Sequence, residues 1–261
     1  MKHVFVREWR AGWKAMLIWA ASVGVFMVSV MAMYPMFEKE MGQMLGLFSN
    51  LGVFTTMFGL DKINMATPMG FFGLEGGVVL SIAGGLFAAM TGIALVAKEE
   101  GRRTAEFLFA QPLGRVPALL GKLLSLIAMV LVFNLVVTLF AMLSFAVAGG
   151  SLEMDLARLM VSQTLMHVQV GLLCFGISCY LKGDSVGLGI GIMLLMYVLS
   201  LFINISKALQ PLRFVTPFYY ADYANVAGGQ LKWAEIAAGY ALAALVATLG
   251  ILHYRSKDLA S

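Results

Sequence analysis

The stretch KEEGRRTAEFLFAQPLGRVPALLGK, residues 98–122, decides the fold of this chain. It gathers acidic and basic residues and two prolines, whereas residues 76–97 before it and 123–152 after it carry no charged side chain. A membrane-spanning helix needs about 20 mostly apolar residues. The flanking runs therefore predict two spanning helices, and the quoted stretch predicts a polar loop that joins them outside the lipid.

Composition extends this interpretation to the whole chain. The 261 residues are 61% hydrophobic and 12% charged, whereas soluble domains average about 45–50% apolar and about 25% charged. The net charge of +4 does not point to nucleic acid, because the basic residues do not cluster within a polar domain that could fold. We therefore expect an all-α membrane protein with no nucleic-acid partner.

Six apolar runs predict six transmembrane helices within a single permease-like domain, 1–261. They cover residues 15–35, 73–97, 121–149, 159–181, 185–205 and 234–254. A further uncharged run, 41–60, is rich in glycine and polar residues. We predict that it lies at the interface or re-enters the membrane without crossing it.

The distribution of basic residues predicts the orientation. With six spans, 12 of the 18 Lys and Arg residues fall in the segments on the side of the two termini. Cytoplasmic segments of membrane proteins are enriched in these residues. The sequence thus predicts a multi-pass protein of the cell membrane with both termini in the cytoplasm.

Two segments outside the spans have their own patterns. In residues 1–14, Phe5, Trp9 and Trp13 share one helical face and basic residues share the other, which predicts an amphipathic interfacial helix in contact with lipid. Between the last two spans, Pro211 and Pro217 interrupt an aromatic-rich stretch. This predicts a broken re-entrant hairpin.

Catalytic patterns fail on inspection. Gly114, Gly121 and Lys122 are spaced too widely for a phosphate-binding loop, and Leu123 stands where that loop needs Ser or Thr. The paired glutamates before Gly101 lack the remaining residues of an intramembrane protease, and the methionines and the two cysteines show no metal-binding spacing. We expect no catalytic site and no metal on this chain.

A few polar residues of the spans are candidates for a substrate path: Glu75, Gln163 and His167. Polar groups within a span are costly and face a cavity or another helix. Hydrogen bonding between helices is the alternative explanation for Gln163 and His167. Separately, Gly183, Gly187 and Gly191 recur every four residues, which predicts a close helix–helix contact within one subunit or across a dimer.

The opening stretch resembles the first cytoplasmic loop of type-2 permeases of ABC transporters. That loop has an acidic residue, then Gly-Thr-x-Glu-x-Leu-Leu, a proline, an arginine, and Gly-Lys opening the third span. The residues that match are Glu100, Thr104, Glu106, Leu108, Pro112, Arg115, Gly121 and Lys122. Arg103, Phe109 and Gly114 depart from the pattern, which leaves the identity of the matching ATPase open.

The resemblance implies a permease subunit that pairs with a second copy of itself and with two copies of a separate ABC ATPase. ATP and Mg would be bound by that ATPase, with no cofactor on this chain. The loop, residues 98–120, would contain a coupling helix seated in the ATPase. Its contact residues would be Glu100, Arg102, Arg103, Thr104, Glu106, Phe107, Leu108, Pro112 and Arg115.

The expected function is export of amphipathic or antimicrobial peptides, because compact permeases of this kind resemble exporters of such cargo. Drugs, lipids or ions are alternative cargoes. A secondary transporter or channel outside the ABC class is a further alternative, although no acidic residue lies at the centre of a predicted span. A membrane signalling or assembly scaffold also remains open.

Overall fold

The computed structural model describes residues 1–39, 52–101, 114–183, 185–227 and 229–256, and within these ranges it contains helices and no strand. Six of the described helices are long and apolar enough to cross a membrane. The prediction of an all-α fold with six apolar spans is confirmed. The six helices are α1 (Lys2–Ala32), α4 (Pro68–Gly101), α6 (Arg115–Val147), α7 (Met154–Ser178), α8 (Val186–Ile205) and α11 (Trp233–Ser256).

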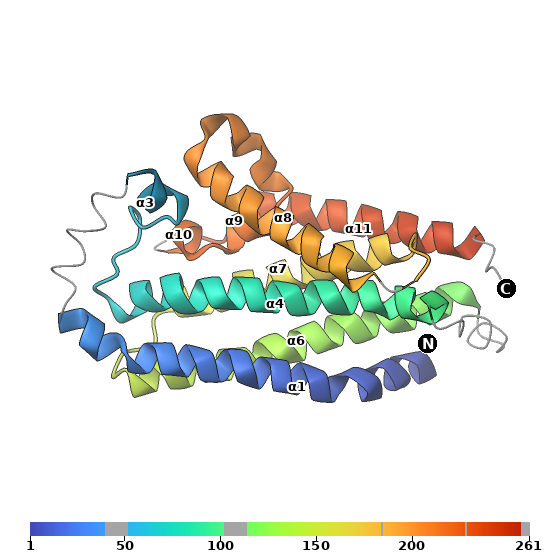
Figure 1. Cartoon of the computed structure of the whole chain (residues 1–261), viewed down its shortest axis with the longest axis horizontal. Coiled ribbons are helices and arrows are strands. Elements are labelled where there is room, and N and C mark those ends of the chain that lie inside the picture. Colours follow the sequence, from blue (N-terminus) through green and yellow to red (C-terminus); the bar gives the residue numbers. More distant parts are fainter. Residues whose placement is uncertain (40–51, 102–113, 184, 228, 257–261) are drawn as a thin grey trace.

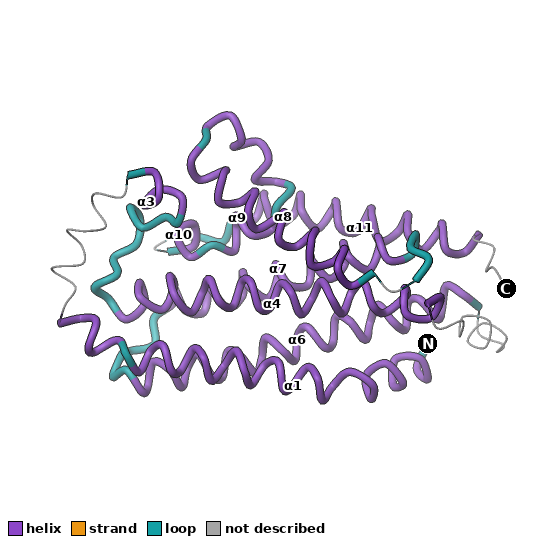
Figure 2. Tube along the Cα trace, viewed as in Figure 1, coloured by secondary structure: helices purple, strands orange, loops and turns teal. Residues whose placement is uncertain are grey.

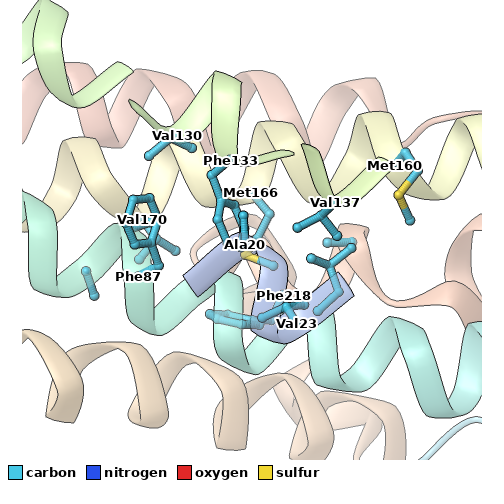
Figure 3. Close-up of a cluster of buried hydrophobic side chains, with 14 of the residues drawn as sticks. Ala20, Val23, Phe87, Val130, Phe133, Val137, Met160, Met166, Val170 and Phe218 are labelled. Atoms are coloured by element: carbon cyan, nitrogen blue, oxygen red, sulfur yellow. The ribbon is translucent and has the colours of Figure 1, made fainter. Parts of the chain in front are cut away.

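The long helices pack as a flattened bundle with α4 and α7 at its centre (Figure 1). α1 packs along α6 on one side, while α8 packs on α4 and α11 packs on α7 on the other side. Because the two central helices touch neighbours on several faces, α7 is the most buried of the spans and α8 the least. Buried side chains from α1, α4, α6 and α7 meet in the interior, where Phe87 stacks on Phe133 (Figure 3).

Glycines allow some of these helices to approach closely. A β-carbon at Gly176 of α7 would lie 2.6 Å from the carbonyl oxygen of Val246 in α11, and one at Gly250 would collide with the backbone of Gly176. At Gly24 of α1 a β-carbon would collide with the ring of Phe140 in α6. The absence of a side chain at these positions therefore sets the distances between α7 and α11 and between α1 and α6.

The start of α1, the end of α4, the start of α6 and the end of α11 all lie at one end of the bundle, which we call the N-terminal end (Figure 1). At about 1.5 Å per residue, the 34 residues of α4 extend about 50 Å. The hydrocarbon core of a bilayer is about 30 Å thick. The last turns of α4 can therefore project beyond the lipid and carry charge.

The N-terminal segment differs from the prediction. Instead of a separate interfacial helix over 1–14, residues 2–32 form one uninterrupted helix. Val4 and Glu8 are buried in the bundle, and at Gly12 a β-carbon would lie 2.8 Å from Cε of Met129, so α1 packs against α6 from its first turns. This packing keeps the amphipathic segment in line with the first span.

The segment between α8 and α11 forms three short helices, one of which begins at Pro217 while Pro211 lies inside another (Figure 2). They are the 3₁₀ helix η1 (Lys207–Phe214), α9 (Pro217–Ala221) and α10 (Tyr223–Val226). Asp222 caps α10 by accepting a hydrogen bond from the backbone N–H of Ala224 at 3.1 Å, and it accepts another from Asn204 of α8 at 3.3 Å. Burial raises the pKa of the Asp222 carboxyl. Whether this segment re-enters a membrane stays a prediction.

The predicted non-spanning run 41–60 is described only from residue 52 onward. There it contains the five-residue helix α3 (Val53–Met57), which packs against α8. Asn204 of α8 donates to the carbonyl oxygen of Met57 at 3.2 Å. A five-residue helix is far shorter than a span, which agrees with the predicted absence of a crossing over these described residues.

Candidate functional site

The most unusual side chain in the bundle is Lys122 of α6, which is 1% exposed. Its ammonium group donates to the carboxylates of Glu8 and Glu99, both at 3.0 Å, and to the carbonyl oxygen of Leu95 at 2.6 Å. An ammonium group has three N–H donors, so all three are used. Lys122 thus ties α6 to both α1 and α4.

Glu8 of α1 is the counterpart of Lys122 and is 2% exposed. Besides the bond from Lys122, its carboxylate accepts hydrogen bonds from Lys98 of α4 and from Arg7, the latter at 2.7 Å. Arg7 also donates to Glu99. These five residues form what we call the charged cluster: Arg7, Glu8, Lys98, Glu99 and Lys122.

The charged cluster connects the end of α4 and the start of α6 to each other and to α1. Lys98 and Glu99 lie in the last turn of α4, and Lys122 lies two turns into α6, so the cluster joins the two stems of the loop that connects these helices. Through Glu8 it also joins them to α1. Because breaking a buried ion pair costs about 3–5 kcal/mol, a movement of the loop stems would be transmitted to α1.

Most of the predicted coupling residues cannot be compared with this geometry. Arg102, Arg103, Thr104, Glu106, Phe107, Leu108 and Pro112 lie outside the described residues. Glu100 belongs to the last turn of α4, and its side chain is not described. Arg115 begins α6 and donates to the carbonyl oxygen of Arg255 at 3.2 Å, so the second stem of the loop also contacts the end of α11.

Sequence reasoning missed the charged cluster, although Lys122 belongs to the matched Gly-Lys pair. The available signal was Glu8, the single acidic residue among the first 37 residues of an otherwise basic and apolar segment. A lone acidic residue in such a segment requires a cationic partner when it is buried. In a bundle of antiparallel helices, the basic residues of other helices that could reach Glu8 were Lys98 and Lys122, on either side of the predicted loop.

A second group of polar side chains lines α7. His167 Nδ1 lies 2.9 Å from Asn134 Oδ1 of α6. Gln163 donates to Ser81 of α4 at 2.7 Å and to the carbonyl oxygen of Ala221 at 3.0 Å. The structure therefore places Gln163 and His167 in hydrogen bonds between helices, which was the alternative to a substrate path.

Two further residues of α7 accept hydrogen bonds from other helices. Gln169 accepts a hydrogen bond from Tyr220 of α9 at 2.8 Å, and the carbonyl oxygen of Leu165 accepts one from Tyr240 of α11 at 2.9 Å. α7 is thereby joined to α4, α6, α9 and α11. Glu75, the third predicted path residue, is exposed on α4 and is absent from these bonds.

The three glycines of the predicted stripe do not all lie on one helix: Gly183 precedes α8, and Gly187 and Gly191 lie within it. Gly183 has a φ of 134°, while Gly187 and Gly191 lie on the exposed face of α8, where an added β-carbon would meet nothing within 4 Å. The close approach to α4 occurs instead at Gly189, where a β-carbon would lie 2.8 Å from Ile93 and 3.1 Å from the carbonyl oxygen of Ala89. Gly187 and Gly191 therefore make no close contact with the described part of this chain.

A groove of about 370 Å³ lies between α1 and α4 near the charged cluster. Ala11, Ala15 and Trp19 of α1 line it opposite Met90 and Ala94 of α4. Glu8 and Lys98 line the part nearest the N-terminal end. Trp19 donates to the carbonyl oxygen of Ala83 at 2.9 Å, a bond that brings α1 and α4 together beyond the groove.

Among the described residues, six apolar helices with a charged cluster at one end define a multi-pass membrane protein. The family model of the ABC-2 family transporter proteins matches residues 3–259. The chain therefore belongs to the ABC-2 transporter family, whose members are membrane subunits that pair with an ABC ATPase. Comparisons with curated proteins and with solved structures gave no significant match.

Proposed function

We propose that this chain is the permease subunit of an ATP-driven exporter that works as a dimer with two copies of a separate ATPase. Both termini would lie in the cytoplasm, and ATP and Mg would be bound by the ATPase, with neither chemistry nor cofactor on this chain. The loop between α4 and α6 would serve as the coupling helix. Closure of the two ATPases would move this loop and tilt the helices attached to it.

The observation that carries the proposal is the charged cluster. A coupling loop works only if its movement reaches the spans, and here buried ions join both of its stems to α1. The contact of Arg115 with the end of α11 adds a further connection. Force applied between residues 101 and 115 would thus reach four helices, namely α1, α4, α6 and α11.

The proposed cargo is an amphipathic or antimicrobial peptide. The support for this cargo is that two helices have apolar surfaces that a second copy or a cargo could contact. On α8 the exposed side chains include Leu188, Leu195 and Phe202. On α1 they include Ile18 and Phe26. Such surfaces suit the apolar face of a helical peptide. Transport into sealed vesicles of a labelled amphipathic peptide, compared with a hydrophobic drug and a labelled lipid, tests this cargo. Uptake of the drug or the lipid without the peptide would reject it.

The coupling role is tested by a Phe107→Ala, Leu108→Ala double variant. Buried aromatic anchors dominate interface energies, so this change should weaken docking of the ATPase by about 10-fold or more. Insertion and thermal stability of the permease should be unaffected. Co-purification with the ATPase and transport in vesicles are the measurements, with the exposed Leu212→Ala of η1 as the matched control. Normal association and transport in the double variant would refute the proposed coupling helix.

A further inference from the structure

The groove between α1 and α4 has an uneven distribution of charge around it. Among the first 14 residues, the exposed ionic side chains are basic: Lys2, Arg7, Arg10 and Lys14. The acidic residue of this segment, Glu8, is buried within the charged cluster and accepts hydrogen bonds from three cations. The surface at this end of α1 is therefore positive.

The interior of the groove is apolar. Small side chains at Ala11, Ala15 and Ala94 leave the space, and Trp19 and Met90 provide large apolar walls. Its volume of about 370 Å³ lies within the range of ligand-binding pockets, about 300–1,000 Å³. An apolar groove between membrane-spanning helices favours a hydrocarbon chain over water.

Two cations lie at the charged end of the groove: Lys98 lines it, and Arg7 is bonded to Glu8, which also lines it. The side chain of Lys98 lines the groove and is 29% exposed, and that of Arg7 is 47% exposed. An ammonium has three N–H donors and a guanidinium has five. Both residues can therefore bind a phosphate while they keep their bonds to Glu8 and Glu99.

From this juxtaposition, we propose that the groove is a binding site for an anionic phospholipid of the surrounding bilayer. An acyl chain would lie between Ala15 and Ala94, and the phosphate would contact Lys98 and Arg7. The lipid comes from the leaflet at the N-terminal end of the bundle. The proposal rests on the shape and charge of the groove, and it does not depend on the identity of the cargo or of the ATPase.

The charge complementarity selects this occupant. A zwitterionic lipid offers the same acyl chain but carries an ammonium group toward a surface that is already positive. Each Lys or Arg near a membrane surface attracts anionic lipid appreciably, and the two cations here are partly neutralised by their carboxylate partners. We therefore expect about fivefold preference for phosphatidylglycerol over phosphatidylcholine.

Trp19 provides the probe, because it lines the groove. The full chain is prepared with Trp9, Trp13 and Trp233 replaced by phenylalanine, which leaves Trp19 as the only tryptophan. It is reconstituted in phosphatidylcholine vesicles that contain a minor, equal fraction of brominated phosphatidylglycerol or brominated phosphatidylcholine. Bromine quenches tryptophan fluorescence at contact. The expected result is stronger quenching by the brominated phosphatidylglycerol, corresponding to about fivefold enrichment beside Trp19 and reduced by salt.

Ala15→Phe fills the groove from an exposed position and should abolish the preference. Ala241→Phe, at an exposed position of α11, is the matched control and should leave it unchanged. Equal quenching by the two brominated lipids would overturn the proposal, because the groove would then take acyl chains at their bulk composition. Absence of quenching by either lipid would also overturn it, because another part of the assembly would then cover the groove.

Discussion

Lys122 shows how one residue can determine the geometry at the end of a membrane bundle. An isolated ammonium would be very costly at 1% exposure. It is tolerated here because two carboxylates and a carbonyl oxygen replace its hydration shell. Because these bonds are needed to offset the cost of burying the ammonium group, α1, α4 and α6 must keep their relative positions around Lys122.

Replacement of Lys122 by methionine tests this constraint. Methionine keeps most of the volume but leaves the buried Glu8 and Glu99 with fewer cations. Glu8 keeps Arg7 and Lys98 as partners, so we expect destabilisation of about 3 kcal/mol, at the lower end of the range for a broken buried pair. Thermal unfolding of the purified chain in detergent measures it.

The exposed Lys232→Met is the control for the loss of a lysine and should change stability by less than about 0.5 kcal/mol. Glu8→Gln combined with Lys122→Met should recover part of the loss, since it removes one of the carboxylates left with fewer cations. If Lys122→Met unfolds at the same temperature as the unaltered chain, the charged cluster does not hold the three helices together.

At the scale of whole helices, the sequence predicted what depends on composition and missed what depends on packing. Long apolar runs identified all six spans, since each must satisfy its own backbone in lipid. The continuity of α1 through residues 1–14 was not predictable in the same way. The aromatic and basic faces of that segment suit a membrane surface, and only contacts with residues far along the chain, such as Lys122 and Met129, draw it into the bundle.

The glycines of α8 illustrate the same division. Their spacing indicated that a helix would approach closely, but spacing alone did not identify the face. The structure uses Gly189 against α4 and leaves Gly187 and Gly191 on the exposed side. The polar residues of α7 were recognised as candidates because polar groups in spans are rare, yet their partners Asn134 and Ser81 became known only from the fold.

Gly189→Leu should destabilise the single chain. A β-carbon there would lie 2.8 Å from Ile93 and 3.1 Å from the carbonyl oxygen of Ala89, both in α4, and the backbone of α4 cannot yield easily. Overpacking of this kind costs about 1–3 kcal/mol. We expect a lower unfolding temperature and reduced yield, measured by thermal unfolding and by size-exclusion chromatography in detergent.

Gly187→Leu is the matched variant two residues away. It adds the same side chain where the described chain offers no contact within 4 Å, so the monomer should unfold as before. If the exposed face of α8 is the contact between two copies, this variant should shift the purified protein from dimer to monomer. An unchanged dimer would exclude Gly187 from that contact, and a destabilised monomer would contradict the packing described for α8.

At the scale of the molecule, the positions of the helix ends predict which segments share one side of the membrane. The start of α1 and the end of α11 lie at the same end of the bundle, together with the end of α4 and the start of α6 (Figure 1). The turn between α6 and α7 lies at the opposite end. With six crossings, His3 and Ser151 should therefore face opposite sides of the membrane, with His3 on the cytoplasmic side given the excess of basic residues there.

Single cysteines test this topology directly. Cys174 and Cys179 are buried, and their replacement by serine or alanine gives a background for His3→Cys and Ser151→Cys, both at exposed positions. In intact cells a membrane-impermeant maleimide should label residue 151 and not residue 3. Permeabilised cells should show labelling at both, which controls for reactivity. Labelling of both positions in intact cells would mean that residues 3 and 151 are separated by an even number of crossings and not by α1, α4 and α6. It would also place the end of α4 and the start of α6, which lie at the same end as residue 3 (Figure 1), on the side away from the ATPase.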